Sequence, residues 1–140
     1  MIYLAQTDTT AGFLSKDLKK INALKNRDEN QPCLITTAKF SELKTLARIP
    51  NAFKNYVRRA KKTTFIYANR KAIRVVRDCK HAEFLRENGY FYSSSANKHG
   101  CKFDEKWARS VADIIVDENF FESSPSSIKK FSKKRMFKIR

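Results

Sequence analysis

Hydrophobic and polar positions along the chain alternate between strand-like runs and helix-like repeats. Apolar residues in the segment 15–25 recur at three-residue spacing, which predicts an amphipathic helix with Ser15 as its N-cap. The runs 63–67 and 72–76 are rich in β-branched and aromatic residues, which predicts two strands joined by a turn near Asn69. Because strands and helices are interspersed, the expected class is α/β or α+β with a mixed sheet.

The same pattern predicts the remaining elements. Further strands are expected at 2–5, 33–35, 90–93 and 113–116, and helices at 41–46, 51–61, 82–88 and 104–111. Polar loops are expected at 7–12 and at 94–97. In the segment 128–140, Phe131, Phe137 and Ile139 are large apolar residues that need burial, so one or two terminal strands are predicted there.

Length and composition predict one soluble domain, residues 1–140. The chain has 140 residues and is 41% hydrophobic, enough for a buried core. No apolar run is long enough for a membrane helix, and the N-terminus has no signal-peptide pattern, so we expect a cytoplasmic protein without membrane contact. Cys33, Cys79 and Cys101 lie far apart, which favours reduced thiols and no protein-ligated metal.

The distribution of charge changes this picture, because the excess of basic residues is concentrated in two segments of the chain. The net charge is +16, and residues 54–80 hold ten basic residues and one acid, while residues 129–140 hold seven basic residues and no acid. A solvated basic face is the simpler interpretation, but solubility alone does not need such segregation, which favours a surface for a polyanion. The side chains expected to form an RNA-facing electrostatic surface are Arg58, Arg59, Lys61, Lys62, Arg70 and Lys71.

Aromatic residues near the basic runs have two interpretations. They can stack on bases, as in single-strand binding proteins, or belong to the core. Since aromatic residues on strands mostly point inward, the core is the favoured interpretation. The residues concerned are Tyr56, Phe65, Tyr67, Phe131 and Phe137.

The motifs of common hydrolases, zinc peptidases and P-loop proteins are absent. Three polar segments remain as candidate chemistry: the hydroxyl-rich run 7–12, the Lys25-Asn26-Arg27 triplet and the run 94–97. Two cations one residue apart at the end of a helix can converge on one phosphate group. Hydroxyl and amide groups after a strand can hydrogen-bond phosphate oxygens or a sugar.

The order of the segments matters more than any one of them. Along the chain stand Gln6-Thr7-Asp8-Thr9-Thr10-Ala11-Gly12-Phe13, Lys25-Asn26-Arg27 with Pro32-Cys33-Leu34, Thr64-Phe65-Ile66, Ala72-Ile73-Arg74-Val75, Ser95-Ala96-Asn97-Lys98-His99-Gly100, Pro125-Ser126-Ser127-Ile128 and Ile139-Arg140. In this order the chain resembles the YrdC/YwlC family of threonylcarbamoyl-adenylate synthases, which act in tRNA modification.

The resemblance implies a fold and a reaction. The fold is a YrdC-like single domain, a twisted mixed sheet flanked by helices, with a concave basic cavity. The reaction joins L-threonine, bicarbonate and ATP into threonylcarbamoyl-AMP, with pyrophosphate released. Magnesium accompanies ATP as part of the substrate, and tRNA or tRNA-modification proteins are expected partners. The family's basic surface has also been linked to RNA binding, double-stranded RNA included.

Roles carried over by position give two sets of residues. Lys25 and Arg27 would hold the ATP phosphates, Ser95 and Asn97 would bind the nucleotide, and Arg140 would close over it. The residues implied for threonine are Thr9, Arg74 and Ser126, with Arg74 pairing with the carboxylate.

The chain also departs from the family pattern. The loop proline and tyrosine are Gln6 and Ala11, and an acid near the end is Lys130. The phosphate-facing motifs are kept more fully than the threonine-facing loop. Two functions are therefore carried forward: an active synthase, and a catalytically divergent YrdC-like protein that binds RNA or a nucleotide. A regulatory or structural protein with an unrelated ligand has no positive signal.

Overall fold

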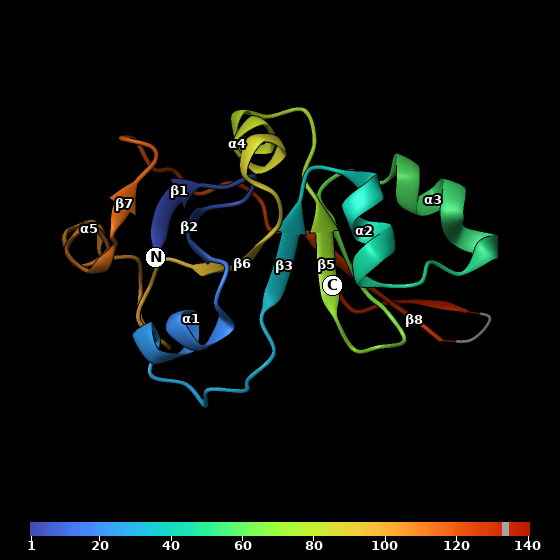
Figure 1. Cartoon of the computed structure of the whole chain (residues 1–140), viewed down its shortest axis with the longest axis horizontal. Helices are drawn as coiled ribbons and strands as arrows, with labels where there is room; N and C mark the ends of the chain where they lie inside the picture. Colours follow the sequence, from blue (N-terminus) through green and yellow to red (C-terminus); the bar gives the residue numbers. More distant parts are fainter. Residues whose placement is uncertain (133–134) are drawn as a thin grey trace. The chain divides into compact units, whose positions relative to one another are not determined.

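The computed structural model describes residues 1–132 and 135–140, so Lys133 and Lys134 of the terminal basic run lie outside the described residues. The described residues form a mixed α/β fold (Figure 1). In chain order the elements are β1 (Tyr3–Gln6), β2 (Ala11–Ser15), α1 (Leu18–Leu24), β3 (Leu34–Thr37), α2 (Phe40–Leu46), the 3-10 helix η1 (Asn51–Phe53), α3 (Lys54–Arg59), β4 (Thr63–Ile66), β5 (Ala72–Val75), α4 (Lys80–Asn88), β6 (Phe91–Ser95), α5 (Glu105–Val111), β7 (Ile114–Ile115), β8 (Ser127–Phe131) and β9 (Met136–Lys138).

The elements fall into two compact units. Unit 1 comprises residues 1–33 and 91–124, and unit 2 comprises residues 34–90 and 125–140. Parallel and antiparallel strand pairs occur in both units, as predicted for a mixed α/β fold. That residues 1–140 act as one domain stays a prediction. Among the described residues, no helix has the length and hydrophobicity needed to cross a membrane.

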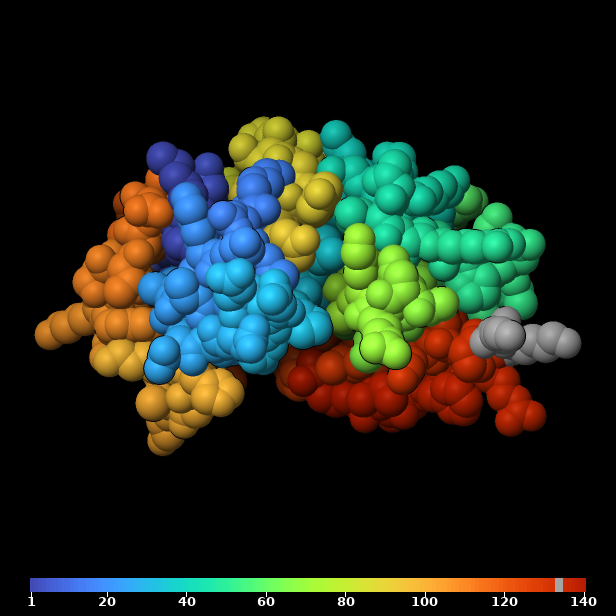
Figure 2. Space-filling model, turned by 60° about the horizontal axis from the view of Figure 1, so that its bottom comes forward, coloured from blue at the N-terminus to red at the C-terminus, as the bar shows by residue number. Residues whose placement is uncertain are grey.

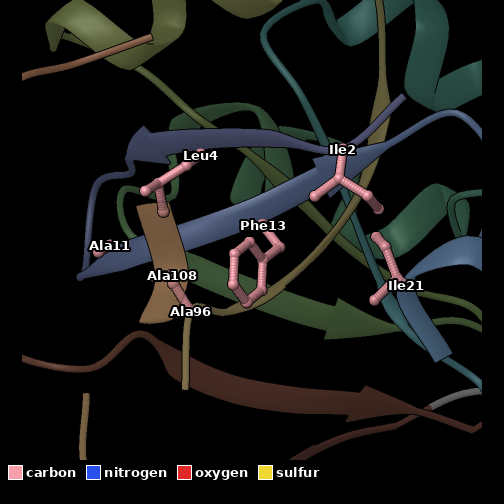
Figure 3. Packing of buried hydrophobic residues seen from close by; sticks show 7 residues of the cluster. All are labelled: Ile2, Leu4, Ala11, Phe13, Ile21, Ala96 and Ala108. Atoms are coloured by element: carbon pink, nitrogen blue, oxygen red, sulfur yellow. The ribbon is translucent and has the colours of Figure 1, made fainter. Parts of the chain in front are cut away.

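Unit 1 is built on the strand order β7-β1-β2-β6. Strand β1 pairs parallel with β7 and antiparallel with β2, and β2 pairs antiparallel with β6. Helix α1 packs on β2 and β6. The core gathers around Phe13, which is buried together with Ile2, Leu4, Ile21 and Ala108 (Figure 3). The apolar spacing of α1 thus provides a buried face for this sheet, as the periodicity predicted.

The start of α1 differs from the prediction. Residues 11–15 form β2, which is buried along its whole length, and the side chain of Asp17 caps the helix by accepting a hydrogen bond from the N–H of Lys19. Ser15 instead ends the strand, and its hydroxyl accepts from the N–H of Asp17 at 3.1 Å. A strand covered on both faces has no alternation of apolar and polar residues. The sequence pattern therefore did not distinguish this strand from the polar loop before it.

Gly12 allows a close approach in β2, and this gives a first prediction. A Cβ at this position would lie 2.8 Å from Cγ2 of Thr7 and 3.3 Å from the carbonyl oxygen of Ser94. Gly12→Ala is therefore expected to lower the free energy of unfolding by about 2 kcal/mol, measured by chemical denaturation. Gly100→Ala is the comparison: no atom lies within 4 Å of its Cβ, and only the φ of +74° opposes the change, at about 1 kcal/mol. An equal loss in both variants would contradict the steric account.

Unit 2 has the strand order β3-β5-β4-β8-β9. The pairs β3–β5 and β4–β8 are parallel, and β4–β5 and β8–β9 are antiparallel. Helix α2 packs on β3 and β5, and α4 packs on β3. The predicted turn between β4 and β5 is confirmed: Tyr67 donates its N–H to the carbonyl oxygen of Lys71 at 3.0 Å, and Arg70 has a φ of 67°.

The C-terminal segment was predicted only in part. Strands β8 and β9 confirm the terminal strands, and Phe131 is buried, with its ring stacked on Phe65 at 5.3 Å between centroids. Phe137 and Ile139 are 47% and 58% exposed, so the prediction that they are buried was wrong. The reason is position: β9 ends the strand order of unit 2, Phe137 lies on this last strand, and Ile139 follows it.

The two polar loops predicted at 7–12 and 94–97 are shorter than expected. Ala11 and Gly12 belong to β2, and Ser94 and Ser95 belong to β6, which was predicted to end at residue 93. The register explains the extension, because Gly12 pairs with Ser95 across the β2–β6 ladder. Small hydroxyl residues are typical of loops, but here the backbone partner decides their conformation.

Candidate functional site

The side chain of Lys25 is the centre of a polar cluster in unit 1. Lys25 is the C-cap of α1, and only 6% of it is exposed. Its Nζ donates to the carbonyl oxygen of Ser95 at 2.8 Å, to Ser95 Oγ at 3.3 Å and to Asn97 Oδ1 at 3.5 Å. The helix end and the strand end thus bring together three of the residues predicted to bind ATP.

Burial changes the acidity of this ammonium group. The pKa of Lys25 falls from 10.5 to about 8, first because burial penalises the charged form and second because Arg27 repels it. A cation that is held among neutral acceptors and close to a second cation lacks a counter-charge. An anionic ligand would supply one, so this cluster is suited to phosphate.

Arg27 follows Lys25 by two residues and carries donors without a partner. The backbone turns after Lys25. Asn26 has a φ of 55°, and the N–H of Arg27 donates to the carbonyl oxygen of Asn22 at 2.8 Å. The buried Asn22 holds the following loop by donating to the carbonyl oxygens of Glu29 and Gln31. Nε and Nη2 of Arg27 are buried and have no hydrogen-bond partner in the structure. Such donors normally have a partner, which points to a bound acceptor.

A cavity of about 700 Å³ opens next to Ser95 and Asn97. Phe103 and Phe120 line it with rings in edge-to-face contact, their centroids 6.0 Å apart, and Phe121 is 63% exposed beside them. Asn97 is fixed at the wall, because its amide donates to the carbonyl oxygens of Lys98 and Cys101. The cavity therefore joins an aromatic wall to a polar edge, the arrangement that suits a nucleoside.

A second polar cluster lies in unit 2 around Arg74. Arg74, Thr64 and Ser126 are all buried, and Nη1 of Arg74 donates to both hydroxyl oxygens at 3.1 Å. Thr64 and Ser126 also share a hydrogen bond of 3.1 Å. Arg140 reaches the same serine, with Nε donating to its carbonyl oxygen at 2.9 Å and Nη2 to its hydroxyl at 3.2 Å. Two guanidinium groups converging on one hydroxyl form a site for a carboxylate or phosphate.

The Thr7–Thr10 turn in unit 1 is held by its own hydroxyls. Thr7 Oγ1 donates to the carbonyl oxygen of Thr10 at 2.7 Å and accepts from the N–H of Thr9 and of Thr10 at 3.2 Å each. Thr9 joins the turn to the segment after β7, since its carbonyl oxygen accepts from the N–H of Ser123 at 2.7 Å. Gln6, which stands where the family has proline, accepts from the N–H of Phe121.

The structure sorts the predicted site residues by unit. Lys25 contacts both Ser95 and Asn97 in unit 1, and Arg27 follows Lys25 by two residues. Arg140, predicted for ATP, contacts Ser126 in unit 2. The predicted threonine set is divided: Arg74 and Ser126 contact each other in unit 2, and Thr9 is in unit 1.

Residues of the basic run 54–80 also differ in exposure. Among the predicted electrostatic residues, Lys62 is half-buried, and the exposed ones are Arg58, Arg59, Lys61, Arg70 and Lys71. Arg74 is buried, so it does not belong to that surface. Among the aromatic residues of the basic runs, Phe65, Tyr67 and Phe131 are in the core, as favoured, while Tyr56 and Phe137 are exposed.

Sequence reasoning missed four residues of these sites. Thr64 was present in a quoted motif, but nothing marked its hydroxyl as a partner of Arg74. The cavity residues Phe103, Phe120 and Phe121 carry no local signal, because they meet through the pairing of segments distant in sequence.

Comparison with known proteins identifies the fold. No family model matches the chain, and neither does any curated protein. P. abyssi Sua5 complexed with L-threonine superposes with a TM-score of 0.78 at 19% identity, over 99% of this chain and 49% of that one. E. coli YciO gives a TM-score of 0.75 at 16% identity, over 99% and 82%. The chain has the Sua5 fold.

These structural neighbours are Sua5/YrdC proteins. Their fold therefore confirms the predicted YrdC-like mixed sheet flanked by helices. MTH1692 from Methanobacterium thermoautotrophicum also matches, with a TM-score of 0.63 at 18% identity over 92% of this chain and 74% of that one. The chain spans about half the length of the Sua5 chains it matches.

Proposed function

We propose that this chain synthesises threonylcarbamoyl-AMP from L-threonine, bicarbonate and ATP, for the threonylcarbamoyl modification of adenosine in tRNA. The observation that carries the proposal is the contact of Lys25 with Ser95 and Asn97, which joins the two phosphate-facing motifs. Two neighbours of the fold support it. P. abyssi Sua5 has been solved with L-threonine. HypF, with a TM-score of 0.73 at 12% identity over 99% of this chain and 26% of that one, has been solved with phosphate and nucleotide.

Unit 1 would bind the nucleotide. The three donors of the Lys25 ammonium face neutral acceptors, and phosphate oxygens would replace these with charged ones. Arg27 would add its unpartnered Nε and Nη2 to the same phosphates. The base would enter the cavity between Phe103, Phe120 and Phe121, and Asn97 would hold its position at the edge.

Unit 2 would bind threonine. The buried Arg74 would present its planar guanidinium group to the carboxylate. Its hydroxyl partners Thr64 and Ser126 hold this group in position. Arg140 is exposed and reaches Ser126 from the chain end, so it would add a second positive charge. Thr9, the third residue that the family pattern implies for threonine, belongs to unit 1.

The reaction needs few protein groups beyond these. The amine of threonine takes up bicarbonate as a carbamate with loss of water, and a carbamate oxygen attacks the α-phosphorus, so that pyrophosphate leaves. Positioning and charge neutralisation are therefore the main contributions of the protein. Magnesium would arrive bound to the triphosphate. No group of three or more histidine, cysteine, aspartate or glutamate side chains in the described residues is placed to hold a metal ion.

The test is incubation with ATP, threonine and bicarbonate, with pyrophosphate and the adenylate product both measured. Lys25→Ala is the inactive control, and Lys106→Ala is the matched control, because Lys106 is an exposed lysine on α5 of the same unit. We expect product from the unmodified chain and from Lys106→Ala, and none from Lys25→Ala.

The outcomes separate the synthase from a divergent relative. Absence of product above the Lys25→Ala background contradicts the synthase. If ATP binding then persists and depends on Lys25, the chain is a nucleotide-binding relative without the transfer activity. If the unmodified chain neither forms product nor binds ATP, both the synthase and the nucleotide-binding relative are contradicted.

A further inference from the structure

Two residues of unit 1 that depart from the family pattern meet at one segment. Gln6 stands where the family has proline, and Ala11 stands where it has tyrosine. Ala11 lines the cavity next to Ser95 and Asn97, and its small side chain leaves more of that cavity open than a tyrosine would. Phe121 lines the same cavity, and Gln6 Oε1 accepts from its backbone N–H at 2.9 Å. The amide that replaces the proline therefore holds an aromatic residue at the cavity that lacks the tyrosine.

The segment that carries Phe121 follows β7 and is tied to the β1–β2 hairpin. In the space-filling view, the orange surface of α5 and β7 lies next to the dark blue surface of the N-terminal residues (Figure 2). Asp117 accepts from the N–H of Gln6 at 2.8 Å, and Ser123 donates its N–H to the carbonyl oxygen of Thr9 at 2.7 Å. Both of these bonds use backbone groups of the hairpin. Only the bond to Phe121 uses a hairpin side chain, so a substitution at Gln6 removes that bond and leaves the other two.

The side-chain amide of Gln6 is fixed at both of its polar atoms. Gln6 ends β1 and is half-buried. Its Nε2 donates to the carbonyl oxygen of Thr7 at 3.1 Å, while its Oε1 accepts from Phe121. An amide that donates on one side and accepts on the other has a single orientation. Gln6 therefore fixes the backbone of Phe121 relative to the turn that follows β1.

The rings that line this cavity differ in the contacts they already make. Phe120 packs edge-to-face on Phe103, and the guanidinium group of Arg109 lies 5.1 Å from the centroid of Phe120. Phe121, by contrast, is 63% exposed, and no ring or cation of the described residues stacks on it. An exposed ring at a cavity with a polar edge is suited to stack on a planar base. Phe121 is therefore the ring that a bound base would cover.

We propose that Gln6 is a positioning residue for the nucleotide, which holds the backbone of Phe121 so that the Phe121 ring stacks on the base. This assignment rests on the proposed function, which places the base in this cavity and gives no role to Gln6. The phosphates lie with Lys25 and Arg27, so Gln6 acts on the base end of the nucleotide alone. Because stacking tolerates any planar base, this contact adds affinity without selecting adenine over guanine.

Calorimetry with ATP and with inorganic tripolyphosphate separates the two ends of the nucleotide, because tripolyphosphate has no base. Phe121→Ala is expected to weaken ATP binding about tenfold, the loss of one stacked ring. Gln6→Ala is expected to weaken it about fivefold, the loss of one hydrogen bond, and both variants should keep the affinity for tripolyphosphate. Gln6→Glu keeps an acceptor for the N–H of Phe121 and should bind ATP as the unmodified chain does. Gln31→Ala, at an exposed glutamine of the same unit, is the control and should change neither affinity.

The double variant decides whether the two residues act together. If Gln6 works through Phe121, Gln6→Ala with Phe121→Ala binds ATP no more weakly than Phe121→Ala alone, whereas independent effects multiply to about fiftyfold. That fiftyfold loss overturns the positioning role, as does unchanged ATP affinity in either single variant.

Equal loss of ATP and tripolyphosphate affinity in Gln6→Ala also overturns it, because Gln6 would then support only the fold. The exposed Phe121 can be replaced without that risk, so Phe121→Ala still tests where the base lies. An unmodified chain that binds neither ATP nor tripolyphosphate contradicts the proposed function together with the role of Gln6. Binding of both that depends on Lys25 and ignores Gln6 contradicts the role of Gln6 alone.

Discussion

Lys25→Met is expected to lower the affinity for ATP by about tenfold to a hundredfold. The substitution keeps most of the side-chain length and removes the charge. A hydrogen bond between charged groups contributes about 1.5–3 kcal/mol, which corresponds to that loss. Isothermal titration calorimetry at pH 7 measures it, with Lys106→Met, an exposed lysine of the same unit, as the control. Unchanged affinity in Lys25→Met would remove Lys25 from the phosphate site.

The pH dependence of the same binding follows from the pKa of about 8. Below pH 8 the Lys25 ammonium is charged and binds phosphate, and above it a growing fraction is neutral. Bound phosphate raises this pKa, so affinity should fall by up to about tenfold per pH unit above 8, while the charge of the phosphates stays constant. Lys25→Arg, charged throughout this range, should flatten the fall. A steep fall in both proteins would assign the titration to another group.

Stability should respond to pH in the opposite direction. The pKa of Lys25 is 10.5 in the unfolded chain and about 8 in the folded one. Between these values the unfolded chain binds more protons, so the free energy of unfolding contributed by Lys25 rises with pH from about 8 to 10.5. Thermal unfolding without ATP, compared between the unmodified chain and Lys25→Met, isolates this term. ATP affinity and stability changing in the same direction would contradict the account.

The contact of Lys25 with Asn97 could be predicted from the sequence. Neither residue has a distinctive neighbourhood, but the order of motifs along the chain placed both in one site, and the structure joins their side chains. The strands 63–67 and 72–76 were predicted for a simpler reason, because β-branched residues flank a turn with Asn69 and Arg70. Local chemistry and motif order were therefore sufficient for these parts.

Other parts depend on pairing that no local pattern reveals. Strand β2 is buried on both faces and has no alternation to detect. Phe137 looks like a core residue in sequence, yet it lies on the last strand of its sheet. Arg74, which motif order assigned to threonine, stands in a run of cations, and its burial comes from the position of β5 between β3 and β4. Each depends on which strands are neighbours in the sheet.

Burial of Arg74 leads to the second large effect. Arg74→Met is expected to raise the KM for threonine by about a hundredfold and to leave the Kd for ATP unchanged. The substitution removes a two-pronged charged contact to the carboxylate, worth about 3 kcal/mol. Met fills much of the same volume, and Thr64 and Ser126 keep their mutual hydrogen bond, so the hydroxyls stay paired. Initial rates over a range of threonine concentrations measure KM, and calorimetry measures ATP binding.

Two further substitutions decide whether the Arg74 effect is recognition or folding. Arg74→Lys keeps a charge but not the fork, so an intermediate KM, raised about tenfold, is expected if the carboxylate is bound in a two-pronged manner. Arg70→Met removes an exposed cation of the same basic run and should change neither constant. If Arg74→Met lowers stability while KM for threonine stays constant, Arg74 only supports the strands, and the threonine site lies elsewhere. A KM that rises with charge loss at both positions would instead reflect long-range attraction, because Arg70 is exposed in the turn between β4 and β5.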